Sequence, residues 1–113
     1  MLRRAVRAVR RGQRAHLLVT ERSMAPVLKP LQLVRVEPVD AERLQIGDVV
    51  IAEVGGRLHL HLVRHIDREA RRVEIASRDG HLDGWTDYAR VYGICTAIGG
   101  RPVPGAAAKT RVG

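Results

Sequence analysis

The sequence predicts a mainly β fold: a small β-barrel-type domain with a short N-terminal helix. Apolar residues make up 45% of the chain, but Phe is absent and aromatic residues are only 3%. The core must therefore consist of Val, Leu and Ile, which suit strands. Short apolar runs also alternate with turn residues along most of the chain. At 113 residues, the chain has the length of a single domain.

The first fourteen residues predict a basic amphipathic helix. Leu2, Ala5, Val6 and Val9 recur at helical spacing, and the pattern ends near Gly12. The remaining positions carry six arginines with no acid among them: Arg3, Arg4, Arg7, Arg10, Arg11 and Arg14. Without them, the formal net charge falls from +8 to about +2. This arm suits an anionic membrane surface or nucleic acid, and the alternative is a solvated arm or a helix that packs on the domain.

Six segments predict strands, because each is rich in β-branched or alternating apolar residues between turn signals. They cover residues 16–20, 31–37, 49–54, 58–66, 73–76 and 91–98. Gly55-Gly56 predicts a hairpin between the third and fourth. Residues 77–87 predict a polar loop, and residues 99–113, rich in Pro, Gly and Ala, predict a flexible tail. The chain thus divides into an arm (1–14), a β-domain (15–98) and a tail (99–113).

The cysteine content and the length of the apolar runs indicate the compartment. Cys95 is the only cysteine, which excludes a disulfide within the chain and fits a reducing environment. No apolar run approaches the roughly 18–20 residues that span a bilayer. Arginines interrupt the N-terminus too often for a secretory signal. We expect a soluble, cytoplasmic protein, with peripheral membrane association through the arm as a further option.

A serine and a row of histidines are the candidates for chemistry. Ser23 follows the first predicted strand in the sequence Ser-Met-Ala-Pro, and a serine needs a base to become a nucleophile. Alternation on strand 58–66 places three leucines toward the core and His59, His61 and His65 on the opposite face. Histidine can accept a proton near neutral pH, so this face offers a general base. For His59 and His65, a solvated or hydrogen-bonded side chain is the simpler interpretation.

The same three histidines raise the question of a metal site. Three ligands on one extended strand cannot surround an ion, so further ligands would have to come from elsewhere. The residues that could supply them are Asp79, His81, Asp83 and Cys95. We predict neither a metal site nor a cofactor.

Several short motifs occur in an order typical of one peptidase superfamily. They are Leu18-Val19, Ser23-Met24-x-Pro26, Ile46-Gly47-Asp48-Val49-Val50, His61-Leu62-Val63, Asp79 with Asp83, and Val91-Tyr92-Gly93. Over roughly residues 17–98, the chain resembles the signal peptidase and LexA-type serine peptidase superfamily. The resemblance implies that superfamily's β-fold and a serine endopeptidase that processes a peptide or protein precursor.

The resemblance also implies roles for individual residues. Ser23 corresponds to the nucleophile of the superfamily. Bacterial and LexA-like members use a lysine base on a later strand, but this chain has only Lys29 and Lys109, and neither lies on that strand. The histidine box of the archaeal and endoplasmic-reticulum type matches His61, which implies a Ser23–His61 dyad.

An acid orients the histidine in that subgroup. Asp83 matches this acid best, and Asp79 matches the aspartate of the Gly-Asp-Asn box. Substrate and oxyanion would lie near four residues around the nucleophile, namely Val19, Glu21, Met24 and Pro26. Glu21 stands where the family usually has Gly or Ser. The alternative function is a catalytically inactive β-domain that binds nucleic acid or another acidic partner through the arginine-rich arm.

Overall fold

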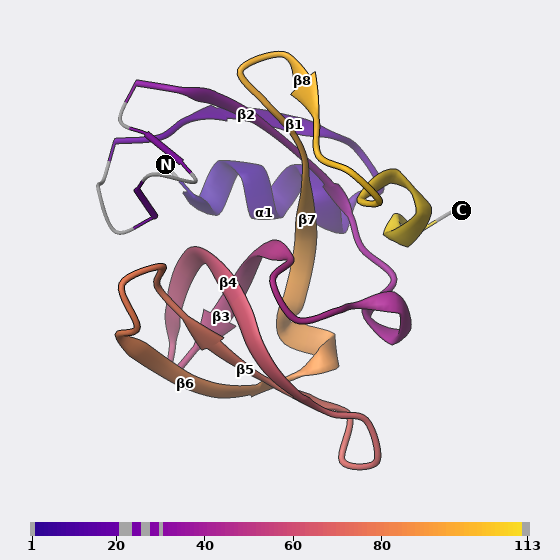
Figure 1. Cartoon of the computed structure of the whole chain (residues 1–113). Coiled ribbons are helices and arrows are strands. Elements are labelled where there is room, and N and C mark those ends of the chain that lie inside the picture. Colours follow the sequence, from indigo (N-terminus) through magenta and orange to yellow (C-terminus); the bar gives the residue numbers. More distant parts are fainter. Residues whose placement is uncertain (1, 21–23, 26–27, 30, 112–113) are drawn as a thin grey trace.

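The computed structural model describes residues 2–20, 24–25, 28–29 and 31–111 (Figure 1). In chain order, its elements are α1 (Leu2–Arg10), β1 (Ala15–Leu18), β2 (Leu33–Pro38), η1 (Ala41–Arg43), β3 (Val49–Val54), β4 (Arg57–Asp67), β5 (Arg72–Ala76), β6 (Leu82–Asp87), η2 (Tyr88–Arg90), β7 (Val91–Ile98), β8 (Arg101–Pro102) and η3 (Ala107–Lys109). Strands predominate, so the predicted mainly β fold with one N-terminal helix is confirmed.

All the strands belong to one antiparallel sheet in the order β1-β2-β7-β3-β4-β5-β6, with β8 paired to β7. Figure 1 shows α1, β1 and β2 in one half of the molecule and β3 to β6 in the other. The long strand β7 runs between the halves and pairs with both β2 and β3. The sheet curls back on itself and brings β6 close to β3. The Thr86 hydroxyl of β6 donates to the Glu53 carbonyl of β3 at 2.7 Å.

Two apolar clusters form the core. In the first, α1 buries Ala5, Val6 and Val9 against β1, β2 and β7, which explains the helical spacing of these residues. The second lies inside the curl of β3 to β6 and consists almost wholly of aliphatic side chains, among them Val63 and Ile75. The scarcity of aromatic residues is therefore matched by a Val, Leu and Ile core.

Gly93 lies where β7 crosses from one half to the other. A Cβ added there would lie 3.0 Å from the Glu37 carbonyl oxygen and 3.2 Å from the Ile51 side chain. Because the carbonyl belongs to the backbone of β2, it cannot move aside easily. The glycine lets β2, β3 and β7 pack closely at this point.

The structure corrects the predicted loop over residues 77–87. Only its first part is a turn, and Leu82–Asp87 forms strand β6, which pairs with β5. The register shifts at this pairing, since Ala76 faces Leu82 and Ile75 faces Gly84. Asp83 is the extra residue of the resulting bulge, so the second half of the predicted loop is instead a bulged strand.

The C-terminal segment differs from the expected flexible tail. β8 pairs with β7, Ala106 is buried, and Thr110 bridges to Val39. The Lys109 ammonium also lies 2.6 Å from the Asp48 carboxylate, and both side chains are only 13% exposed. This Pro-, Gly- and Ala-rich segment therefore packs against the domain. In the part of the chain that the structure describes, no helix is long and apolar enough to cross a membrane.

Candidate functional site

The β4 strand carries two neighbouring histidines into the site. His59 and His61 are two residues apart in an extended strand, so their side chains emerge on the same face. Their rings stack with centroids 5.2 Å apart and planes inclined by 27°. The side chains are 20% and 11% exposed, so both imidazoles lie largely out of bulk water.

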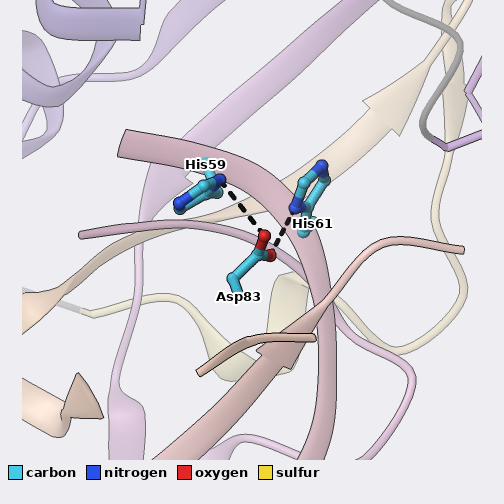
Figure 2. A group of neighbouring side chains, drawn as sticks. All are labelled: His59, His61 and Asp83. Atoms are coloured by element: carbon cyan, nitrogen blue, oxygen red, sulfur yellow. Dashed lines mark hydrogen bonds and ion pairs between the residues drawn. The ribbon is translucent and has the colours of Figure 1, made fainter. Parts of the chain in front are cut away.

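Asp83 reaches these histidines from β6 (Figure 2). His61 Nδ1 lies within hydrogen-bond distance of Asp83 Oδ2, at 2.5 Å, and His59 Nδ1 lies 3.5 Å from Oδ1. The aspartate side chain is only 3% exposed, so this carboxylate depends on the two imidazoles rather than on water. Since an ionised carboxylate only accepts hydrogen bonds, Nδ1 of His61 carries a proton and Nε2 is the ring's proton-accepting nitrogen.

The bulge in β6 explains how an acid from that strand meets β4 across the curl. A bulged residue leaves the regular alternation, and its side chain takes a new direction. Gly84 follows with φ of 127°, a backbone conformation that L-residues rarely adopt. The bulge at Asp83 and Gly84 therefore directs the Asp83 carboxylate toward His61 while the strand continues.

A second bulge separates His65 from the other two histidines. The register of β4 against β5 shifts between Val63 and His65, which reverses the alternation beyond that point. His65 instead pairs with Glu74 at 2.8 Å, and its side chain is 57% exposed. The expected single row of His59, His61 and His65 is therefore wrong, and only the first two share a site.

Asp79, the other predicted acid, has different partners. Its carboxylate accepts hydrogen bonds from the Ser77 hydroxyl and from the His81 backbone N–H. The Ser77 hydrogen bond, together with the His81 N–H, lowers the pKa of Asp79 below its ordinary value. Asp79 thus stabilises the turn that leads into β6, and Asp83 is the acid that lies beside His61.

A pocket of about 290 Å³ opens next to the histidines. Its wall consists of His59, His61 and the following residues, most of them aliphatic: Leu2, Leu17, Leu18, Val19, Thr20, Met24, Leu28, Arg57, Leu58 and Leu60. The wall therefore combines two imidazoles with a mostly apolar surface. Such a pocket suits an apolar side chain of a ligand beside a polar reactive centre.

Residues on both sides of Ser23 in the chain border this pocket. Val19 and Met24, two of the predicted substrate-binding residues, are buried and line it, as does Thr20. Two backbone hydrogen bonds hold Val19, from its N–H to Gln32 and from Leu31 to its carbonyl. Ser23, Glu21 and Pro26 lie outside the described residues.

The two lysines of the chain lie away from the base position. Lys109 is engaged with Asp48, and Lys29 is exposed in the segment after Met24. The sequence analysis correctly placed both lysines outside β4. It did not predict that His59 shares the Asp83 carboxylate with His61. The His-x-His spacing could have indicated this, since it places two rings on one face. His59, His61 and Asp83 also form a group whose potential metal-ligating atoms lie within 4.8 Å of one another.

The basic arm presents its arginines to solvent. Its apolar face is buried, and all five arginines between positions 3 and 11 are exposed. Arg10 lies over the Tyr92 ring at 5.3 Å, and Arg14 forms a long ion pair with Glu37 at 3.9 Å. The arm is therefore a helix packed on the domain that still offers a cationic surface.

Comparison of the chain with protein-family models, curated proteins and solved structures found no match.

Proposed function

We propose that the protein is a serine endopeptidase of the signal peptidase and LexA type, with Ser23 as nucleophile, His61 as base and Asp83 as the orienting acid. One observation carries the proposal. His61 is hydrogen-bonded to a buried carboxylate at 2.5 Å, and it lines a pocket together with Thr20 and Met24, which flank Ser23 in the chain. With Ser23 proposed as the partner of the other ring nitrogen, this histidine and its acid would complete a catalytic triad.

The proposed reaction passes through an acyl-enzyme. The Ser23 hydroxyl oxygen attacks the scissile carbonyl carbon while its proton passes to His61 Nε2. Asp83 stabilises the resulting imidazolium through Nδ1–H. The tetrahedral intermediate collapses, the C–N bond breaks, and the leaving amine takes the proton from His61. A water molecule then hydrolyses the ester, with His61 again acting as base, and Ser23 is regenerated.

Two further features support a peptide substrate. β1 is the terminal strand of the sheet, and its residues Leu17 and Leu18 line the pocket. An extended peptide could pair with such an edge and place one apolar side chain in the pocket. The backbone N–H of Ser23 is the candidate oxyanion donor, and Glu21 must point away from it for that donor to act. The single cysteine, Cys95, is buried, which fits action in the cytoplasm.

The test uses the fact that the chain has only two serines, Ser23 and Ser77. A fluorophosphonate probe should label the wild type at Ser23, as mapped by peptide mass spectrometry. Labelling should be lost in Ser23→Ala and strongly reduced in His61→Gln. Ser77→Ala is the matched control and should keep the labelling. Absence of Ser23-dependent labelling from pH 6 to 9 (roughly the range where histidine can act as a base) would refute the peptidase.

The second candidate is a binding module, favoured by the cationic face of α1. Deletion of the arm is a poor test, because it would uncover the core that Ala5, Val6 and Val9 cover. Replacing Arg3, Arg4 and Arg7 by Gln removes charge from exposed positions only. If the arm binds nucleic acid, affinity should fall and the salt slope should decrease by roughly one for each lost phosphate contact. An unchanged slope would exclude the arm as the contact.

A further inference from the structure

The cluster of His59, His61 and Asp83 has a second chemical capability besides orienting a base. Two imidazole nitrogens and a carboxylate converge from two strands, β4 and β6, and their potential ligand atoms lie within 4.8 Å of one another. Figure 2 shows both rings turned toward the same carboxylate. Each oxygen of Asp83 faces one histidine, so the carboxylate contacts both rings.

This donor set is one that zinc prefers. Zinc binds histidine nitrogen at about 2.0–2.1 Å and carboxylate oxygen at about 2.0–2.2 Å, with tetrahedral geometry, so its ligands lie about 3.3 Å apart. His59 Nδ1 and Asp83 Oδ1 are already 3.5 Å apart. The His61–Asp83 pair, now at 2.5 Å around a shared proton, would have to open by roughly 0.8 Å.

The surroundings also suit an ion with one open coordination position. The carboxylate is 3% exposed, so its charge is poorly solvated and a divalent cation would compensate it. The two histidines line the 290 Å³ pocket, from which a water molecule or a ligand could complete the coordination. Three protein ligands plus one exchangeable position is the arrangement of open zinc sites.

We infer that His59, His61 and Asp83 form a binding site for Zn²⁺ and that the occupied site is an inhibited form of the protein. The sequence-based prediction of no metal site considered His65 as the third ligand on the strand. In the structure, the bulge in β4 turns His65 away from His59 and His61, and the bulge in β6 brings Asp83 to them. The ligand atoms are those of the orienting hydrogen bond. Zinc and the Asp83-oriented base therefore exclude each other. The inhibitory part rests on the proposed peptidase, but the binding part does not.

Metal binding is tested directly with the full chain prepared without a histidine tag. Co²⁺ is titrated while its visible absorption is recorded, and Zn²⁺ is then added as a competitor. We expect one Co²⁺ per chain with the absorption of a tetrahedral site, displaced by Zn²⁺. Affinity should fall at least about tenfold in His59→Asn and in Asp83→Asn. His65→Gln is the matched control and should bind as the wild type does.

Circular dichroism and thermal melting show whether each variant folds. If Asp83→Asn does not fold, His59→Asn decides the question alone, since it alters a partly exposed side chain. No tetrahedral absorption in the wild type would overturn the inference. Binding that survives His59→Asn, or that disappears in His65→Gln, would overturn it as well.

A labelling experiment separates this inference from the proposed function. Zn²⁺ should suppress fluorophosphonate labelling of Ser23 over the concentration range in which it displaces Co²⁺, and a chelator should restore it. Labelling without metal binding would refute the zinc site and leave the peptidase intact. Metal binding without any labelling of the metal-free protein would refute the peptidase and leave the zinc site intact.

Discussion

Replacement of Asp83 by Asn changes one atom of the candidate site and addresses the role of the buried carboxylate. In the wild type, the carboxylate accepts the Nδ1 proton of His61 at 2.5 Å. An amide in its place can donate to Nδ1, which favours the tautomer with the proton on Nε2. His61 would then present a donor rather than an acceptor to the proposed nucleophile, and the imidazolium of the proposed mechanism would lose its counter-charge.

The size of the effect follows from the geometry. A contact of 2.5 Å between Nδ1 and Oδ2 places the two charge centres about 4 Å apart, and at an effective dielectric constant of about 20 their attraction is about 4 kcal/mol. The 3% exposure of Asp83 leaves little further screening by water. Since each 1.36 kcal/mol is tenfold in rate, labelling of Ser23 should slow by about 1,000-fold. This lies within the roughly 100- to 10,000-fold range of a positioned base.

The assay is the pseudo-first-order rate of fluorophosphonate labelling of Ser23, with the His61 ring tautomer read from nitrogen chemical shifts. Asp79→Asn is the matched control, because it makes the same chemical change in an acid held by Ser77 and His81. Its rate should stay within about twofold of the wild type. The orienting role of Asp83 is refuted if Asp83→Asn does not slow labelling, or if the Nδ1–H tautomer persists in Asp83→Asn.

Three further predictions concern the domain that holds the site. Lys109→Met should lower the free energy of unfolding by about 2 kcal/mol and the melting temperature by about 8 °C, because Asp48 stays largely buried without its partner. A loss of stability below about 0.3 kcal/mol would mean that the C-terminal segment does not dock on the domain. Gly93→Ala should destabilise by roughly 1–3 kcal/mol in chemical denaturation, since its Cβ meets the Glu37 carbonyl, and a neutral result would contradict this packing. Burial raises the pKa of Cys95 to about 11, so its reaction with a thiol reagent at pH 8 should be slower by about 100-fold or more than in denaturant, and rapid native labelling would show an open core.

The strands could be predicted because their physical signals are local. Alternation and β-branched residues located residues 49–54 and 91–98 with the bounds that the structure has, and the Gly55-Gly56 turn lies between β3 and β4 as expected. The helix was equally visible, since its apolar spacing is the face that the first core cluster buries. These features depend on residues that are close in the chain, so their patterns can be recognised in the sequence alone.

What could not be predicted depends on bulges and on long-range contacts. The polar composition of residues 77–87 predicted a loop, and only the pairing of β6 with β5 reveals a bulged strand. The same effect in β4 separated His65 from His61, because one extra residue reverses the alternation. The C-terminal segment was assigned as flexible because its residues are small, whereas Lys109 finds its partner 61 positions earlier in the chain. Asp83 was assigned to His61 only through the family resemblance.

The proposal that Ser23 and His61 form a catalytic pair is tested most directly by a crystal structure of the protein in which the distance from Ser23 Oγ to His61 Nε2 is measured. Because Nδ1 is engaged with Asp83, we predict that Nε2 is the nitrogen facing the serine. The distance should lie near hydrogen-bond reach, roughly 2.6–3.2 Å or somewhat longer without substrate. A Ser23 side chain on the opposite side of the sheet from His61, or one facing only Nδ1, would contradict it.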